Sequence, residues 1–125
     1  MTLFPEKKTS LLVIDDDEQI LRLLRRFLSK HFDSLATAGK LKEAELYLEN
    51  HHVTHLVSDL NLGPNEPNGF DIVTRLRRLY PHIHLAIVFT AEPSPSTPLP
   101  PAVDVLVQKN GSLDELIEAL GIADL

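Results

Sequence analysis

The sequence predicts one α/β domain, in which helices cover both faces of a parallel sheet. The chain has 125 residues, which is enough for a single domain. Short apolar runs alternate along it with segments whose apolar residues recur at helical spacing. Strands that alternate with helices pair in parallel and are buried on both faces, which explains why the apolar runs are continuous.

Composition limits the function. The chain has 43% apolar residues, a net charge of −6 and no cysteine, so disorder, disulfides and zinc–thiolate chemistry are excluded. No apolar run approaches the roughly 18 residues that span a membrane. The order of apolar and charged residues at the N-terminus does not fit a signal peptide. We therefore expect a cytoplasmic protein without membrane contact and, because it lacks a basic run, without direct nucleic acid binding.

Two strand–helix pairs are predicted in the first half of the chain. Residues 11–14 form an apolar run that stops at three aspartates. The apolar residues of segment 20–28 have helical spacing, and Asp17 is placed to cap that helix. Residues 34–38 suit a short second strand, and residues 41–48 suit a second helix.

The third pair follows the same scheme. Residues 55–59 read as a strand that ends on an aspartate, and the loop 63–69 is dense in turn-forming residues. Segment 70–79 has the pattern of an amphipathic helix, and residues 84–89 predict the fourth strand.

The last crossover should differ from the others. Residues 92–101 contain five prolines, which remove helix donors, so the fourth helix should be shortened or absent. Residues 103–107 predict the fifth strand. Ser112 is expected to cap a final helix over 113–120, with Glu115 in the capping-box position.

The predicted strands end on residues that carry chemistry. Asp15 and Asp16, Asp59, Thr90 and Lys109 follow or end four different strands. Ligands of open α/β sheets bind beyond this edge. Converging carboxylates favour a hard cation, Mg²⁺ rather than Zn²⁺. A carboxylate beside Mg²⁺ can attack phosphorus, and hydroxyl and ammonium groups can bind the phosphoryl oxygens.

These strand ends, read as motifs, resemble the receiver domain of two-component response regulators. The motifs are LVIDDD at 12–17, SDLNL at 58–62, VFTA at 88–91 and VQK at 107–109. The resemblance covers essentially the whole chain. It implies a flavodoxin-like (βα)5 three-layer sandwich with a sheet of order 2-1-3-4-5.

The resemblance also implies roles for the acidic residues. Asp59 would be the phosphoacceptor and a ligand of Mg²⁺. Asp16 would bind the metal directly, Asp15 mainly through a water, and Asn61 through its backbone carbonyl. Asn61 and Glu92 would occupy the positions that tune self-dephosphorylation.

Thr90 and Lys109 would bind the phosphoryl group, but the sequence departs from the family around them. Leu106 stands where the family has a switch aromatic, and Asn110 where it has proline. With the proline-rich crossover, these departures indicate an altered output surface.

The function implied is that of a signalling switch rather than a metabolic enzyme. A sensor histidine kinase or histidine phosphotransfer protein would phosphorylate Asp59 with Mg²⁺, and only slow self-catalysed transfer and hydrolysis would follow. The downstream effector is not identified. We expect residues 1–125 to be one receiver domain without an output domain, either as a stand-alone regulator or as part of a longer chain.

Two alternatives remain open. A pseudo-receiver would use the same fold as a constitutive interaction module, which Leu106, Asn110 and the proline crossover favour. A haloacid-dehalogenase-like phosphatase would read residues 15–17 as its DxD motif, although Gln19 stands where that family has Thr or Val.

Histidines form a separate cluster in the sequence. His51, His52 and His55 have metal-like spacing, but surface histidines near a helix end are the interpretation we favour. His82 and His84 flank the start of a predicted strand and have no assigned partner.

Overall fold

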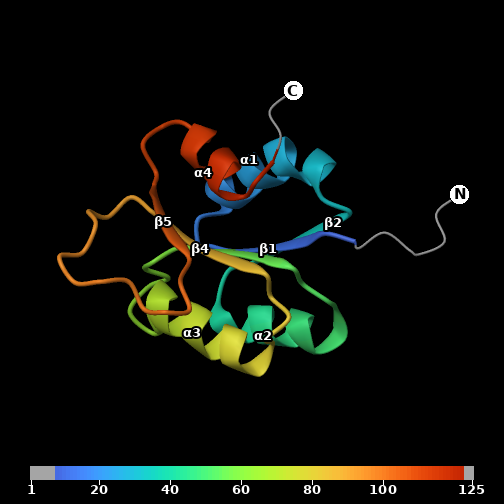
Figure 1. Ribbon diagram of the computed structural model, residues 1–125, viewed down its shortest axis with the longest axis horizontal. Helices are drawn as coiled ribbons and strands as arrows, with labels where there is room; N and C mark the ends of the chain where they lie inside the picture. The colour runs from blue at the N-terminus through green and yellow to red at the C-terminus, as the bar shows by residue number, and fades with distance from the viewer. Residues whose placement is uncertain (1–7, 123–125) are drawn as a thin grey trace, which may run out of the picture.

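Five parallel strands form the central sheet of the computed structural model, which describes residues 8–122 (Figure 1). Their order in the sheet is β2-β1-β3-β4-β5, as the resemblance implied. This confirms the flavodoxin-like topology. The strands are β1 (Ser10–Ile14), β2 (Ser34–Ala38), β3 (His55–Ser58), β4 (Leu85–Thr90) and β5 (Val105–Gln108).

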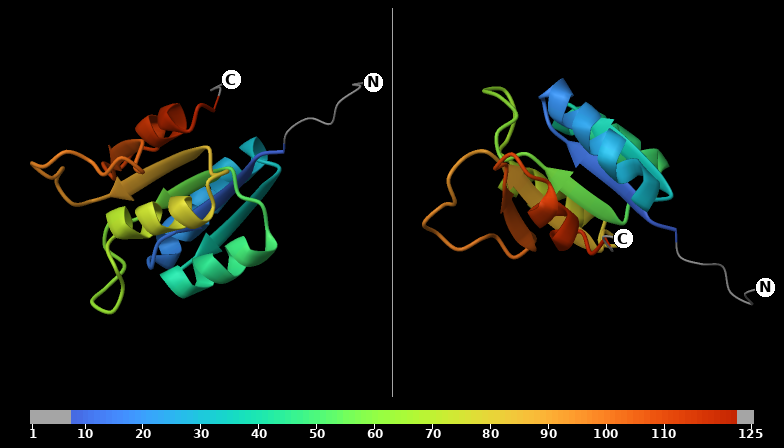
Figure 2. Two further views of the ribbon diagram at one scale, coloured as in Figure 1. Left: turned by 60° about the horizontal axis from the view of Figure 1, so that its bottom comes forward. Right: turned by 90° about the horizontal axis from the view of Figure 1, so that it is seen from above.

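Helices cover both faces of the sheet, so the domain has three layers (Figure 2). Helices α1 and α4 lie on one face, and α2 and α3 lie on the other (Figure 1). No helix in the described range is long and apolar enough to cross a membrane. The helices are α1 (Glu18–Leu28), which continues into a 3-10 turn at Ser29–His31, α2 (Leu41–Asn50), α3 (Gly69–Leu79) and α4 (Asp114–Ala119).

Two apolar clusters, one on each side of the sheet, make up the core. Successive side chains of a strand point to opposite faces. In β1, Leu12 and Ile14 therefore pack toward α2 and α3, whereas Leu11 and Val13 pack toward α1 and α4. All four side chains are almost completely buried. Burial on both faces is the reason that the strands appear in the sequence as unbroken apolar runs.

Local signals at helix ends are partly confirmed. Asp17 caps α1 as predicted, with its carboxylate accepting a hydrogen bond from the Gln19 N–H at 2.9 Å. The capping box predicted for the last helix is wrong. The Ser112 N–H donates to the Asn110 side chain at 3.2 Å, so it is not available to Glu115. The helix begins at Asp114, whose N–H donates to the Ser112 hydroxyl at 3.1 Å.

The proline-rich crossover has no helix. Between β4 and β5 the described chain follows turns and bends, and Figure 2 shows it projecting beyond the sheet. Strand β5 begins at Val105, two residues later than predicted, because the Val103 N–H closes a turn onto the Pro100 carbonyl at 3.0 Å. The helix expected to be shortened or absent in this crossover is therefore absent.

Arg77 of α3 fastens the end of this crossover to the sheet. Its guanidinium donates to the Ala102 carbonyl and the Asp104 carboxylate, both at 2.8 Å. It also donates to the carbonyls of Ile83 and His84 at 3.1 and 3.0 Å, just before β4. One half-buried side chain thus ties α3 to the segments that precede β4 and β5.

Removal of this clamp should destabilise the domain. Arg77→Ala leaves three backbone carbonyls and the Asp104 carboxylate without a charged donor, and we expect a loss of about 2 kcal/mol in the free energy of unfolding. Urea denaturation measures the loss. Arg78→Ala is the matched control, because Arg78 is the exposed neighbour on the same helix. Equal stabilities of the two variants would contradict the role given to Arg77.

Candidate functional site

The sheet itself holds the charged residues that follow β1, β3 and β5. The N–H groups of Asp15, Asp59 and Lys109 each donate to a carbonyl on the adjacent strand, at 3.0, 2.8 and 2.7 Å. The ladder therefore extends one residue beyond each strand. All three residues are fixed at the same edge of the sheet, as the sequence predicted.

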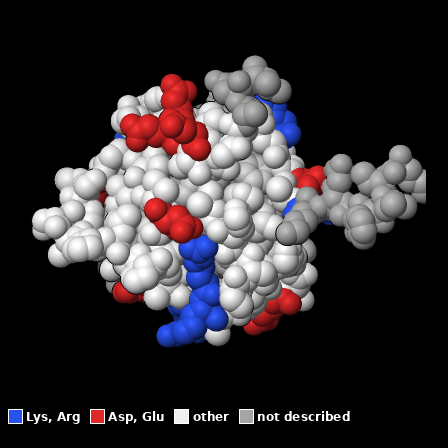
Figure 3. Space-filling model, viewed as in Figure 1, with Lys and Arg blue, Asp and Glu red and all other residues white. Residues whose placement is uncertain are grey.

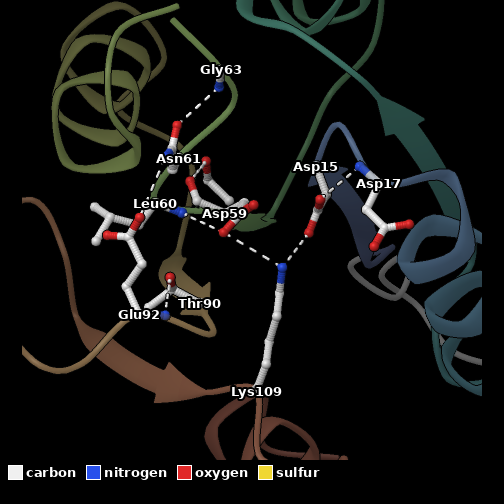
Figure 4. A network of polar contacts seen from close by, with 10 residues as sticks. Asp15, Asp17, Asp59, Leu60, Asn61, Gly63, Thr90, Glu92 and Lys109 are labelled. Atoms are coloured by element: carbon white, nitrogen blue, oxygen red, sulfur yellow. Dashed lines mark hydrogen bonds and ion pairs between the residues drawn. The ribbon is translucent and has the colours of Figure 1, made fainter.

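Carboxylates from two strand ends meet at this edge. One oxygen each of Asp15, Asp16 and Asp59 lies within 4.8 Å of the other two. Asp15 is 2% exposed, Asp59 is half-buried and Asp16 is exposed. The Lys109 ammonium lies between the two more buried carboxylates, 2.7 Å from Asp15 Oδ2 and 3.5 Å from Asp59 Oδ1 (Figure 4).

The two buried carboxylates have different surroundings. Both oxygens of Asp15 are occupied, because Oδ1 accepts the Asp17 N–H at 2.9 Å and Oδ2 binds Lys109. For Asp59, Oδ1 accepts the Leu60 N–H at 2.8 Å and lies near Lys109. Within residues 8–122, Asp59 Oδ2 accepts no protein hydrogen bond. Asp59 therefore has one carboxylate oxygen without a protein partner, whereas each oxygen of Asp15 already has one.

Electrostatics at Asp59 favour an added cation. Burial, followed by the nearby Asp15 carboxylate, raises the pKa of Asp59, and Lys109 and the Leu60 N–H offset this only in part. One ammonium thus does not balance the clustered carboxylates. Three carboxylate oxygens at this spacing are a donor set that suits Mg²⁺, which binds hard oxygen ligands and retains several waters. The site residues therefore fit the predicted metal.

Backbone contacts fix the chain around Asp59. The buried hydroxyl of Ser58 donates to the Asp59 carbonyl at 2.9 Å, and the Gly69 N–H donates to the Leu60 carbonyl at 2.7 Å. A Cβ on Gly69 would lie 2.1 Å from the Asp59 carbonyl oxygen. Only glycine therefore allows α3 to begin this close to the site. The sequence patterns assigned no role to Ser58, although a serine that ends an apolar strand was a visible signal.

Polar contacts link the two loops at the rim of the site. The Asn61 side chain accepts the Gly63 N–H at 3.0 Å and donates to the Glu92 carboxylate at 3.3 Å. The Glu92 N–H in turn donates to the Thr90 hydroxyl at 3.1 Å (Figure 4). Thr90 is only 1% exposed, so its hydroxyl is buried beneath these loops. The metal role of the Asn61 carbonyl stays a prediction.

A distant carboxylate anchors the long loop that follows Asp59. Glu66 Oε1 accepts the Leu41 N–H at 2.7 Å, at the first residue of α2. The N-cap of α2 is Lys40, which has no acceptor in its side chain and makes no capping bond. The loop therefore supplies the cap. No local sequence pattern indicates this contact, because the two residues are 25 positions apart.

The residues that depart from the family pattern have structural partners. Leu106 of β5 is partly buried against the apolar cluster beneath α2 and α3. Asn110 shapes the turn after β5 by accepting the Ser112 N–H. The Lys109 ammonium also lies 5.6 Å from the centroid of the Phe89 ring. The turn thus directs Lys109 into the site without a proline or a cis peptide bond.

Comparisons with known sequences identify the family of this chain. The profile of the response regulator receiver domain matches residues 11–120. A regulator from Pseudomonas aeruginosa, the alginate biosynthesis transcriptional regulatory protein AlgB, is 34% identical over 113 residues. That alignment covers 90% of this chain and 23% of AlgB. The chain therefore spans about a quarter of the length of the curated relatives it matches. The chain belongs to the response regulator receiver domain family.

Solved structures share the fold. A CheY-like receiver domain protein from Methanospirillum hungatei superposes with a TM-score of 0.79 at 21% identity, covering 92% of each chain. A response regulator from Burkholderia pseudomallei, solved with a phosphorylated aspartic acid and a calcium ion, has a TM-score of 0.76 and 25% identity, covering 90% of this chain and 66% of its own. Receiver domains are signalling switches, and the acidic cluster described above occupies the carboxyl edge of this fold.

Substitution of Gly69 should disrupt the site. Gly69→Ala places a methyl group against the Asp59 backbone, so helix and loop must separate, and we expect a loss of about 2 kcal/mol in the free energy of unfolding. Thermal or urea unfolding measures this loss. Gly39→Ala is the matched control, because its nearest contact is the flexible end of Glu43 at 3.3 Å. A Gly69→Ala variant as stable as wild type would refute the close approach.

Asp59→Asn should stabilise the protein near neutral pH in the absence of metal. The raised pKa of Asp59 means that the folded state holds its proton more strongly than the unfolded chain. Ionised Asp59 thus destabilises the fold as pH rises through its pKa, and the variant lacks this charge. Urea unfolding in EDTA should show an advantage at neutral pH that disappears below the usual aspartate pKa. A variant less stable than wild type at neutral pH would contradict this sign.

Proposed function

We propose that this receiver domain accepts a phosphoryl group on Asp59, with Mg²⁺, from phosphohistidine on a sensor histidine kinase or a histidine phosphotransfer protein. The observation that carries the proposal is the position of Lys109, which contacts Asp15 and the Oδ1 atom of Asp59 while Asp59 Oδ2 has no protein partner within residues 8–122. A nucleophilic oxygen and a cation for the incoming charge thus lie at one sheet edge.

The transfer step follows from these atoms. Asp59 Oδ2 attacks phosphorus, a P–O bond forms, the P–N bond of the donor breaks, and the imidazole leaves with the electron pair of that bond. The Lys109 ammonium, 3.5 Å from Asp59 Oδ1, can shift to a phosphoryl oxygen. The Thr90 hydroxyl accepts from the Glu92 N–H, which leaves its own proton free to donate to a second phosphoryl oxygen.

The residues that would hold Mg²⁺ are Asp15, Asp16, Asp59 and the Asn61 backbone carbonyl. When bound, the cation neutralises charge on the carboxylates and on the transferring phosphoryl group. Asp15 supports this arrangement through its bonds to Lys109 and the Asp17 N–H, which keep its carboxylate in place. The phosphorylated aspartic acid and cation in the Burkholderia regulator support the same assignment here.

The way in which the signal leaves the domain differs from the family pattern. The aromatic position is Leu106, and the crossover before it has no helix, so a partner must read another surface. These features keep the pseudo-receiver, a constitutive interaction module, as the second candidate. The family match and the place of Asp59 beside Lys109 disfavour the phosphatase interpretation. We place the domain in the cytoplasm with its kinase, and its effector is unidentified.

Intact-mass spectrometry after incubation with acetyl phosphate tests the proposal. Wild type should gain one phosphoryl adduct only with Mg²⁺, and Asp59→Asn should gain none. Asp71→Asn is the matched control, because Asp71 is exposed on α3 and does not belong to the carboxylate cluster, and it should behave as wild type. Lys109→Gln should slow adduct formation by about tenfold or more, because the incoming charge loses its cation.

Two outcomes would overturn the proposal. An adduct that persists in Asp59→Asn would place the phosphoacceptor elsewhere. If neither Mg²⁺ nor beryllofluoride, a phosphoryl mimic, binds to wild type, the pseudo-receiver interpretation is the correct one.

A further inference from the structure

A cavity of about 980 Å³ lies at the opposite end of the strands from the acidic cluster. Four histidines line it: His52, His55, His82 and His84. They come from the segments that lead into β3 and β4, which the parallel register of His55 with Leu85 places side by side. In Figure 1 this is the end of the sheet where the chain enters β1. None of these residues belongs to the site described above.

The four histidines form two pairs. The rings of His52 and His82 stack with centroids 4.2 Å apart, and those of His55 and His84 meet edge to face at 6.0 Å. His51 lies outside the cavity lining and stacks on Tyr47 with centroids 4.1 Å apart. The grouping that matters is therefore different from the one suggested by sequence spacing.

Basic residues line the cavity, and carboxylates lie only beside it. Lys8 and Arg77 belong to the lining, and among the described residues no aspartate or glutamate does. Asp104 is paired with Arg77, and Asp33 accepts the Thr9 N–H at 2.8 Å and lines an adjoining hollow with His52. The other ring neighbours are Phe32, which packs against His55, and Tyr80, which packs against His82.

Hydrogen bonding holds the His55 ring in place at the start of β3. The Thr54 hydroxyl accepts the Ser10 N–H at 2.8 Å and lies 2.7 Å from His55 Nδ1. One ring nitrogen of His55 is thus engaged with the protein, and Nε2 is the nitrogen left for a ligand.

Protonation of this cluster is unfavourable without a counter-ion. Burial, followed by the neighbouring His84, lowers the pKa of His55, and burial, followed by His52, lowers the pKa of His82. Each pair would place two cations in contact if both rings were protonated. Three metal-binding groups occur together in the described residues only at the acidic cluster, so the histidines do not form a comparable metal site. An anion is the ligand that would relieve their repulsion.

We propose that this histidine cavity binds a small organic molecule with two or more negative charges, and that binding is coupled to protonation of the histidines. The volume is within the range of small-molecule sites and far exceeds a single inorganic ion. An anion favours the protonated rings, so by linkage its affinity rises as pH falls. The shared ligand chemistry is that of phosphate esters and polycarboxylates.

Histidine-ring NMR with added ethanedisulfonate tests the coupling, because this probe keeps its charge between about pH 6 and about pH 8. At constant ionic strength and without Mg²⁺, resonances of the four cavity histidines should move, and those of His31 and His51 should not. The affinity should be about tenfold higher at the lower pH, since at least one proton is taken up on binding. Equal shifts of all six histidines, or affinity independent of pH, would overturn the proposal.

Matched variants locate the ligand. The double variant His52→Gln and His82→Gln should weaken binding about tenfold, because it removes one protonatable pair at exposed positions. His51→Gln is the control and should bind as wild type. Lys109→Gln should also bind as wild type, which separates this cavity from the acidic site. Pyrophosphate and citrate then distinguish a phosphate ligand from a carboxylate ligand. Loss of binding in His51→Gln or Lys109→Gln would overturn the assignment.

Discussion

The ion contacts of Lys109 with Asp15 and Asp59 are the constraint on which the carboxyl edge of this domain depends. The first strand brings one carboxylate, the third brings another, and the last brings the only ammonium that contacts both within the described chain. Without that cation the buried carboxylates would repel each other, and the raised pKa of Asp59 shows that the balance is incomplete even with it. Additional positive charge would therefore stabilise the ionised carboxylates of this site.

Lys109 reaches the site only because β5 pairs with β4 in the sheet. This pairing forms although the crossover between the two strands has no helix. Proline excludes the helix from residues 92–101, and Arg77 donates charged hydrogen bonds to the segments that lead into β4 and β5. The crossover is also tied to β5 by the contact of Gln108 with Ser94 at 3.1 Å. A response regulator receiver domain can thus hold Lys109 beside Asp15 and Asp59 without a fourth crossover helix.

The carboxyl and amino ends of the parallel strands carry side chains of opposite charge. Carboxylates gather at the carboxyl edge and favour a cation, whereas histidines and basic residues gather at the amino edge and favour an anion. Other acidic side chains lie over α4, as Figure 3 shows, and its acidic residues are Asp114, Glu115 and Glu118. The net charge of −6 is thus not evenly distributed between the two ends of the strands.

The sequence by itself determined the strands, the helices and the residues at the strand ends, because apolar periodicity and strand termini are local patterns. These patterns alone were enough to assign Asp15, Asp59 and Lys109 to one edge of the sheet. Only the tertiary structure decided contacts between residues far apart in the chain: the Glu66 cap on α2, the Arg77 clamp and the pairing of His52 with His82. Such contacts depend on how loops return across the sheet, and no local periodicity encodes that path. The failed capping box has a different reason, because there two local patterns compete: the Asn110 side chain, two residues before Ser112, accepts the Ser112 N–H that the capping-box pattern assigns to Glu115.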